Sequence, residues 1–505
     1  MFTAPCKFAL VFMLAAPTLL GAQATPSPLG IFEGHSDVGK SLHPGSANFD
    51  ASTQTYTVTG SGADMWAAED DFQFLWKKMS GDVALSADIR LVGTTGHQHR
   101  KAVLMLRQSL DSDAEEVDLA LHADGLTALQ YRDAKGENLR NIQSAVSAPR
   151  RVRIERRGDY VYAFVSDAGG KLIPAGASTK LAFGSPVYVG LGICSHDKNV
   201  TETAIFSNVK LEQLSPSQGK PALYSALETV DVRSTSRQVI YVAPVRFETP
   251  NWSGDGKSLL FDQGGMMRKF VLGTAMEPTV VPTGSRTKIL GDHGVSPDGT
   301  MIQISDSSGD GTSRIYVVPA EGGEPRLVTK NGPSYTHGWS PDGKTLAFEG
   351  MRDGALQVYT IPVAGGEEKQ LTSGKAYNDC SEFSGDGRSI YFASDRTGSM
   401  QIWQMQTDGS AQQQVLSDDR EDWFPHVSPD GTMIAFLAYI KGTQGHPADT
   451  DVELRLLTIA DKKVKVLATL LGGRGTINGP SWSPDSRRVA FVSYELIPEE
   501  DLSPQ

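Results

Sequence analysis

Residues 338–348 read GWSPDGKTLAF, and variants of this stretch recur through the C-terminal half of the 505-residue chain. In the segment Ser340-Pro341-Asp342-Gly343, proline fixes φ and glycine permits a positive φ, a combination typical of tight turns. The residues on either side read as two short strands. The five further copies are NWSGDGKSLLF from Asn251, GVSPDGTMIQI from Gly294, EFSGDGRSIYF from Glu382, HVSPDGTMIAF from His426 and SWSPDSRRVAF from Ser481. The unit is therefore a strand, a turn and a returning strand, present six times.

The spacing of these copies predicts the fold of the C-terminal half. The motif serines are separated by 43, 44, 44, 44 and 55 residues. One period holds four strand-like runs: Tyr335–Ser340, Thr345–Glu349, Leu356–Ile361 and a last run that ends near Leu371. A four-stranded unit of this length is typical of a β-propeller blade. A single blade cannot bury both of its faces, so the units must stack in a ring.

The ends of the repeat array indicate how the ring closes. The last copy, Ser481–Tyr494, supplies two strands, and two more precede the first copy at Ala226–Val232 and Gln238–Ala243. We expect these strands to complete one blade together, because closure removes sheet edges that would otherwise stay exposed. The sequence thus predicts a six-bladed β-propeller over residues 222–497.

The N-terminal half has a different pattern. Residues 31–214 lack the repeat and show short alternating runs such as Val83–Val92, Lys101–Arg107 and Tyr160–Val165, separated by turn residues. This pattern favours an antiparallel β-sandwich or jelly roll. The predicted fold class is all-β, with an N-terminal jelly roll or β-sandwich followed by the propeller.

The first 24 residues read as a secretory signal peptide. Lys7 precedes an apolar run, Phe8–Leu20, that is too short to span a bilayer, and Ala22-Gln23-Ala24 matches a cleavage site. No later segment is apolar enough to cross a membrane. We therefore expect an exported chain, periplasmic or secreted, whose signal peptide is removed.

Charge and cysteine content narrow the classes of partner. The formal net charge is −12, which argues against nucleic acid and against anionic membrane surfaces. Cys6 leaves with the signal peptide, and Cys194 and Cys380 lie in different halves of the chain. Two buried thiols are expected rather than a disulfide framework.

Two family resemblances follow from these stretches. The SPDG repeats, with IYVVPAEGGEPRLVT and VYTIPVAGGEEKQLT between them, resemble the propeller of TolB-like proteins over residues 222–497. TolB proteins carry an α/β domain before the propeller where this chain has its alternating runs. The resemblance therefore implies the scaffold, and a Tol-like role in envelope assembly is the weakest of the functions left open. The stretches GDVALSADIRL, RVRIERRGDYVYAFV and VYVGLGICSH resemble a concanavalin-like jelly roll. That resemblance implies, as an expectation, recognition of a glycan.

The residues just before each SPDG turn are expected at one mouth of the propeller channel. Neighbouring loops add His446 and the arginines Arg352, Arg396 and Arg474. The residues read off the inner strands are Asp292, His293, Tyr335, His337, Tyr377, Asp379, Glu382, Trp423, His426 and Asn478.

These residue types suggest three roles. Imidazoles converging in a pocket suit a divalent metal (Mn, Zn or Ca), with His293, His337 and His426 as predicted ligands. Catalytic acid–base work is assigned to His337, His426, Asp379 and Glu382. Ligand binding falls to the aromatic and polar residues Tyr335, Tyr377, Trp423, His446, Arg474 and Asn478.

Several functions remain open at this stage. The first is an exported protein that binds a glycan or cell-envelope component at the channel mouth. The alternative is a metal- or His-dependent carbohydrate-active enzyme, either a polysaccharide lyase or a glycoside hydrolase, with its active site there. A third interpretation is structural, because polar residues at a channel mouth also bind water and hold blades in register. The sequence does not predict the oligomeric state.

Overall fold

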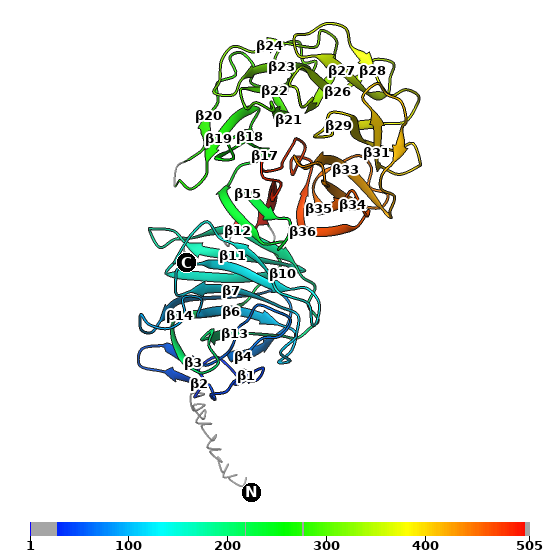
Figure 1. Cartoon of the computed structure of the whole chain (residues 1–505). Helices are drawn as coiled ribbons and strands as arrows, with labels where there is room; N and C mark the ends of the chain where they lie inside the picture. The colour runs from blue at the N-terminus through cyan, green and yellow to red at the C-terminus, as the bar shows by residue number, and fades with distance from the viewer. Residues whose placement is uncertain (2–27, 218, 275–276, 500–505) are drawn as a thin grey trace.

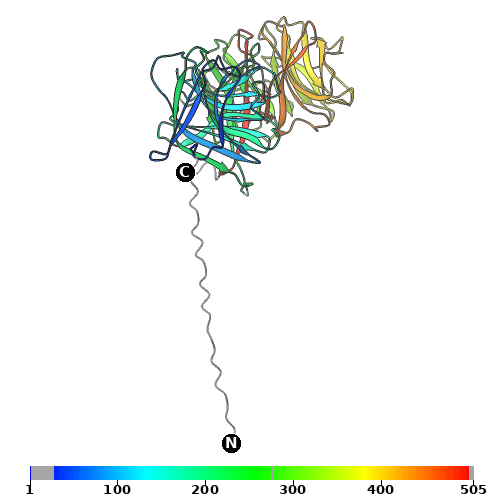
Figure 2. The same ribbon diagram turned by 90° about the horizontal axis from the view of Figure 1, so that it is seen from below.

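The computed structural model describes residues 1, 28–217, 219–274 and 277–499, and these form 37 strands joined by turns and loops. Two packed sheets form the N-terminal part, and a ring of small sheets forms the C-terminal part (Figure 1). Seen from below, the two parts lie side by side (Figure 2). The predicted signal peptide, apart from Met1, lies outside the described residues.

The first sheet of the N-terminal part is antiparallel except at one pair of strands, β9 and β16. In spatial order its ten strands are β1 (Gly34–Val38), β4 (Phe72–Met79), β13 (Val187–Cys194), β6 (Lys101–Arg107), β7 (Glu116–His122), β8 (Thr127–Arg132), β9 (Arg140–Gln143), β16 (Arg237–Ala243), β15 (Ala222–Asp231) and β37 (Arg488–Ile497).

The second sheet is antiparallel throughout and is built from the N-terminal half alone. Its seven strands, in spatial order, are β12 (Leu172–Lys180), β11 (Tyr160–Ser166), β10 (Arg151–Arg157), β5 (Val83–Leu91), β14 (Glu202–Gln213), β3 (Thr55–Gly60) and β2 (Ser46–Asp50).

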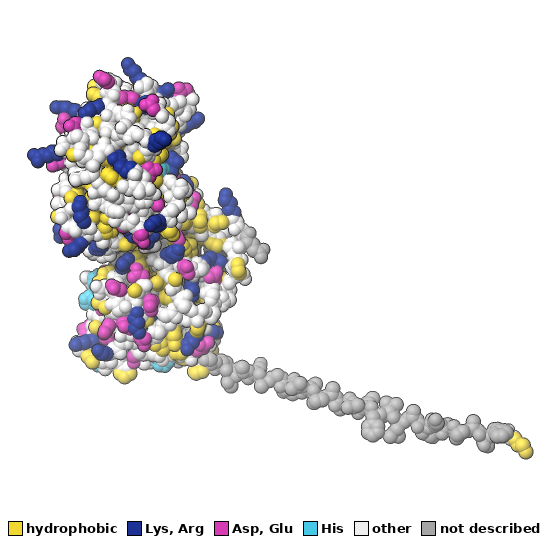
Figure 3. Space-filling view, turned by 90° about the vertical axis from the view of Figure 1, so that its right-hand side faces the viewer, with side chains coloured by type: hydrophobic (Ala, Val, Ile, Leu, Met, Phe, Trp, Pro, Cys, Tyr) yellow, Lys and Arg dark blue, Asp and Glu magenta, His cyan; other side chains and the backbone are white. Residues whose placement is uncertain are grey.

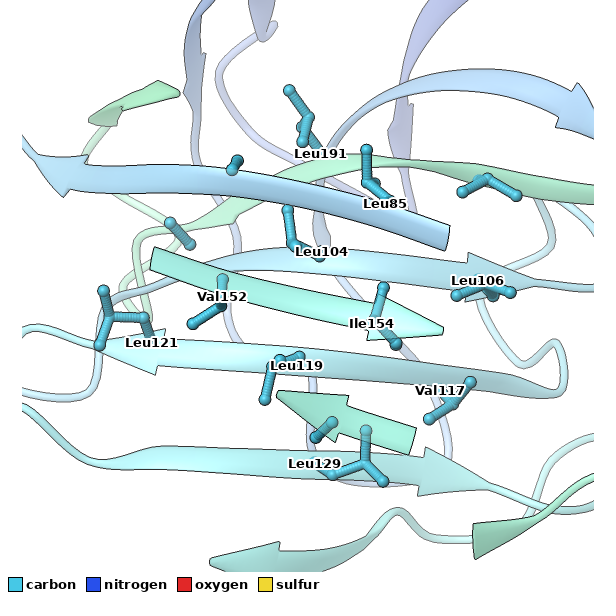
Figure 4. Packing of buried hydrophobic residues seen from close by; sticks show 14 of the residues in the cluster. Leu85, Leu104, Leu106, Val117, Leu119, Leu121, Leu129, Val152, Ile154 and Leu191 are labelled. Atoms are coloured by element: carbon cyan, nitrogen blue, oxygen red, sulfur yellow. The ribbon is translucent and has the colours of Figure 1, made fainter. Parts of the chain in front are cut away.

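The core between these sheets comes from alternate residues of their strands. Leu104 and Leu119 from the first sheet meet Leu85 and Ile154 from the second, and all four are at most 1% exposed (Figure 4). Period-2 alternation in the sequence therefore corresponds to one buried face on each sheet. The finer prediction of a jelly roll stays a prediction.

The C-terminal half is a β-propeller, as the repeats predict. It contains five separate four-stranded sheets, each with its strands in sequence order. The blades are β17 (Glu248–Trp252), β18 (Ser258–Gln263), β19 (Met266–Val271) and β20 (Thr279–Val280); β21 (Ile289–Val295), β22 (Met301–Asp306), β23 (Arg314–Pro319) and β24 (Arg326–Leu327); β25 (Ser334–Trp339), β26 (Thr345–Met351), β27 (Leu356–Pro362) and β28 (Lys369–Gln370); β29 (Asn378–Phe383), β30 (Ser389–Ser394), β31 (Gln401–Gln406) and β32 (Gln413–Gln414); and β33 (Arg420–Val427), β34 (Met433–Ile440), β35 (Ala448–Thr458) and β36 (Val464–Gly473).

The prediction of six blades is wrong, because the residues that the structure describes form five. The strands from the two ends of the array do pair, with β15 antiparallel to both β37 and β16. However, β16 also forms parallel pairs with β9, at Arg237 with Ile142 and at Gln238 with Gln143. These strands therefore belong to the ten-stranded sheet, while β37 packs between β36 and β17 and fills the remaining sector of the ring.

The motif serine fixes the turn in every repeat. The Ser340 hydroxyl donates to Asp342 Oδ1 at 2.6 Å and accepts from the Thr345 amide at 2.9 Å. The same serine-to-aspartate bond is present in the other copies, at 2.6–2.7 Å. The side chain thus supplies hydrogen bonds that hold the two strands at the turn in register.

Contacts beyond the shared sheet join the two parts. The Tyr160 hydroxyl and the Lys180 ammonium, both on the second sheet, bind the carboxylate of Asp451 on β35. Ile497 of β37 packs with Tyr162 and Phe164. The propeller is therefore held against the N-terminal sheets at several points.

The cysteine prediction is confirmed, since Cys194 and Cys380 are both free and buried. The visible face carries Lys, Arg, Asp and Glu side chains of both signs interspersed over both parts (Figure 3). In the described part of the chain, no helix has the length and hydropathy needed to cross a membrane.

Candidate functional site

The inner strands of the propeller carry irregularities just before their SPDG turns. The pairing register shifts within each of the five inner strands. Thr249, Cys380 and Phe424 have positive φ values of 56°, 58° and 56°. A β-bulge of this kind redirects side chains, here at the rim of the channel.

A segment of the chain crosses the channel between these strands. We call residues 474–480, which follow β36, the channel segment. The carbonyl of Asn478 lies 3.0 Å from His337 Nδ1, and that of Pro480 accepts from Asn251 Nδ2 at 2.9 Å. The carbonyl of Ile477 is bound by His426 Nε2. Side chains from β17, β25 and β33 therefore hold this segment inside the ring.

A cavity of about 210 Å³ lies beside the channel segment. It contains most of the residues that the sequence placed at the mouth. Its lining consists of Asp292, Tyr335, His337, Met351, Leu356, Tyr377, Asp379, Phe424, His446, Arg474 and Asn478.

Asp379 lies between two histidines from different blades. His337 Nε2 is 3.7 Å from Asp379 Oδ1, and His446 Nε2 is 3.8 Å from Asp379 Oδ2. His337 Nε2 is also 3.3 Å from Glu349 Oε2 on β26. The arrangement gives each carboxylate an imidazole neighbour but no lysine or arginine at ion-pair distance among the described residues.

Burial shapes the protonation of this cavity. It raises the pKa of Asp292 to about 7, against the opposing effect of Arg474. It also raises the pKa of Glu349 well above its usual value, with Asp379 adding to the effect. Burial lowers the pKa values of His337 and His446. Neutral imidazoles and crowded carboxyl groups together favour a bound proton or cation.

One group of side chains at the edge of the cavity has the geometry of a metal site, and two of its three members line the cavity. Ligand atoms of His337, Asp379 and Cys380 lie within 4.8 Å of one another. Burial raises the pKa of the Cys380 thiol, so the thiolate would form only with a cation present. Sequence reasoning missed Cys380 and Glu349. The signal for Glu349 was an acidic residue inside the apolar strand TLAFEGM.

The structure does not bring the three predicted metal ligands together. His293 Nδ1 is 2.5 Å from Asn251 Oδ1, and burial lowers its pKa to about 3. His426 Nδ1 is 2.7 Å from Glu382 Oε2, and its other nitrogen binds the channel segment. His293, His426 and Glu382 are absent from the cavity lining. His337 and His426 sit three and two residues before their motif serines, and successive strand residues point to opposite faces.

The remaining predicted residues form the surroundings of the cavity. Trp423 is 2% exposed and packs edge-on against His446 at 4.6 Å and Tyr377 at 6.0 Å, measured between ring centroids. Arg352 pairs with Glu368 at 3.0 Å, and Arg396 donates to Asn378 Oδ1 at 2.7 Å. These two arginines brace the blades outside the cavity.

Comparisons with known proteins agree with the propeller. The family model described as the TolB beta propeller domain matches residues 334–458, from β25 to the end of β35. An uncharacterized protein of Agrobacterium fabrum is 43% identical over 273 residues, which are 54% of this chain and 93% of that protein.

One solved structure of a similar chain gives the same result. A protein of Agrobacterium tumefaciens with a provisional TolB name is 43% identical and has a TM-score of 0.53, over 54% of this chain and 99% of that one. TolB from Acinetobacter baumannii is 15% identical with a TM-score of 0.41, over 64% of this chain and 79% of that one.

Proposed function

The chain belongs to the TolB-like β-propeller family, and from this premise we propose that it is an exported binding protein that holds a glycan or cell-envelope ligand in the propeller cavity. One observation carries the proposal. Two aromatic side chains, Tyr335 and Tyr377, share a ring-sized cavity with carboxyl groups, neutral imidazoles and Arg474. Flat aromatic faces with a few convergent polar groups are typical of sites for polar ring compounds.

The wider organisation is part of this proposal. Residues 1–24 would be removed on export to the periplasm or medium. A concanavalin-like jelly roll over 31–214 and a propeller over 222–497 are supported by β14 ending at Gln213 and β15 beginning at Ala222. Determining the N-terminal residue of the exported protein tests the first point.

Replacing Tyr335 with alanine is expected to weaken binding of a cavity ligand at least about tenfold, because an aromatic face is lost. Monosaccharides and uronic acids fit the cavity size and serve as probes, with saturation-transfer NMR as the measurement. Arg352→Ala is the control, since Arg352 pairs with Glu368 and does not line the cavity. Equal affinity of the wild type and Tyr335→Ala would place the ligand elsewhere.

A metal-dependent carbohydrate-active enzyme is the second candidate, and the His337, Asp379 and Cys380 group favours it. Glu349 Oε2 strengthens this reading, because it is buried and makes no hydrogen bond within the described part of the chain. Imidazole with thiolate suits Zn²⁺ better than Ca²⁺ or Mn²⁺. With a metal bound, the site would polarise a carbonyl or water, and the chain's own groups would position the sugar.

Adding Zn²⁺ to metal-free protein is expected to raise its Tm, since a ligand at about 100 times its Kd stabilises by about 2.7 kcal/mol. His337→Ala and Asp379→Asn should each abolish the rise and the bound zinc measured by elemental analysis. His293→Ala is the matched control, because His293 is an equally buried histidine outside the cavity lining. Zinc retained by His337→Ala would rule out this site.

A further inference from the structure

Four of the ten histidines gather at one end of the N-terminal sheets, away from the propeller cavity: His97, His99, His122 and His196. Histidine side chains are visible on the surface of this part (Figure 3). Two cavities, of about 540 and 270 Å³, both have His122 in their linings. We call this pair of hollows, which share His122, the histidine groove. The larger hollow lies within the range of about 300–1,000 Å³ typical of ligand pockets.

The four imidazole rings contact one another along the lining of the groove. His97 and His196 stack with ring centroids 4.2 Å apart and planes 3° apart, and His99 stands edge-on to His122 at 5.9 Å. His196 Nε2 is 3.3 Å from an oxygen of Asp64, and His99 Nδ1 is 3.4 Å from one of Asp124. Stacking and these contacts hold the rings in place. The ring nitrogens do not form a converging set of metal ligands.

The smaller hollow combines an exposed aromatic face with hydrogen-bonding groups. The Trp66 side chain, 41% exposed, lies at its lining together with Gln130 and Asn141. Asn141 Oδ1 is buried and has no hydrogen-bond partner among the described residues. A buried acceptor without a partner costs free energy, so a ligand that donates to it would be favoured.

The charges of the groove are already balanced. The Lys101 ammonium is buried, donates to the Met65 carbonyl at 2.7 Å and to Gln130 Oε1 at 3.2 Å, and lies 3.3 Å from Asp64. Burial lowers the pKa of His122 to about 4, so this ring is neutral at pH 7. No unpaired cation among these residues selects an anion.

A metal is a poor fit for the same residues. Among the described residues, the group with converging ligand atoms is in the propeller, and it includes none of these four histidines. The groove therefore offers flat aromatic and imidazole faces, side-chain amides, and oxygen atoms that can accept hydrogen bonds from hydroxyl groups. Aromatic and imidazole faces pack against apolar C–H surfaces, and planar amides and carboxylates bind hydroxyl groups.

We propose that the histidine groove binds a neutral oligosaccharide chain. Trp66 and the stacked imidazoles pack against the faces of successive sugar rings, and Asn141, Gln130 and Asp64 bind their hydroxyl groups. This site is separate from the propeller cavity and stands whether or not that cavity binds a sugar.

The test is calorimetric titration of the full-length mature protein with neutral hexasaccharides of glucose, xylose and N-acetylglucosamine, and with an anionic hexagalacturonate. We expect at least one neutral chain to bind, and Trp66→Ala and His99→Ala each to weaken it at least tenfold. Trp66 is 41% exposed and belongs to none of the buried hydrophobic clusters, so its variant should keep the circular dichroism spectrum of the wild type.

Two control variants locate the binding. Trp76→Phe changes an aromatic residue of β4 outside the groove, and Tyr335→Ala changes the propeller cavity. Both should leave the affinity for the neutral chain unchanged. The proposal is overturned if no neutral hexasaccharide binds, if hexagalacturonate alone binds, or if Trp66→Ala binds as well as the wild type. Loss of binding in Tyr335→Ala alone would move the chain to the propeller and also overturn it.

Discussion

Arg132→Ala is expected to destabilise the protein by about 3–5 kcal/mol, the usual cost of removing one partner of a buried ion pair. Asp70 would keep its longer contact with Arg107, at 3.3 Å, but would lose both of its shorter contacts with Arg132. The Arg132 guanidinium donates bidentate hydrogen bonds to the Asp70 carboxylate, at 2.7 and 2.9 Å. Its other hydrogen bonds go to the carbonyls of Ala67, Ala114 and Glu137. Both side chains of the pair are 0% exposed.

This effect is large because Arg132 joins three segments of chain. Ala67 and Ala114 lie on loops that cover the outer face of the first sheet, and Arg132 ends β8 within it. Alanine would leave Asp70 and three carbonyls without this donor. Urea unfolding followed by circular dichroism measures the loss. The control is Lys135→Ala, whose exposed ion pair with Asp111 should contribute little to stability because solvent screens it. A similar, small effect for both variants would contradict the prediction.

Arg237→Ala is expected to lower the free energy of unfolding by about 3–5 kcal/mol. Arg237 lies where strands from the two ends of the repeat array pair. Arg237 on β16 binds both carboxylate oxygens of Glu228 on β15, at 2.9 and 2.7 Å. The Ser493 hydroxyl of β37 donates to the same carboxylate at 2.5 Å. Removing Arg237 leaves the Glu228 carboxylate buried without an ion-pair partner at β15 and β37, the paired strands from the two ends of the repeat array.

Two measurements test the role of Arg237. Urea unfolding gives the loss of stability, and limited proteolysis should cut near β37 faster in the variant. Arg233→Ala changes an exposed arginine of the adjacent turn and should leave both unchanged. A double variant, Glu228→Gln with Arg237→Met, should be more stable than Arg237→Ala, because it leaves no buried charge. If the double variant is the less stable, the unpaired charge is not the cause.

The propeller could be predicted because its signal is local and repeated. Each blade needs only its own turn residues, such as Pro341 and Gly343, and a period that the serines mark. The number of blades could not be predicted, because it depends on which strand β16 pairs with outside the repeat. Its partner β9 is almost a hundred positions earlier in the chain, and two parallel pairs decide the outcome.

The candidate site was predictable at the level of the channel mouth but not of the cavity. Tyr335, His337 and Asp379 reach it as expected from their places before the motif serines. Cys380 was missed, because a bulge with positive φ at this residue alters which side chains face inward. His426 does not line the cavity, because its ring binds the channel segment, whose path no repeat position encodes.

The shared sheet also sets the distance between the two proposed binding sites. Because β9 and β16 are hydrogen-bonded in one sheet and Asp451 ties β35 to the second sheet, the two halves have no free hinge between them. A propeller ligand and a groove ligand would then sit at a fixed spacing. A polymer whose repeat matched that spacing would bind both at once, and the second contact would add avidity without new chemistry. The fixed spacing would therefore make binding selective for polymers of a particular length.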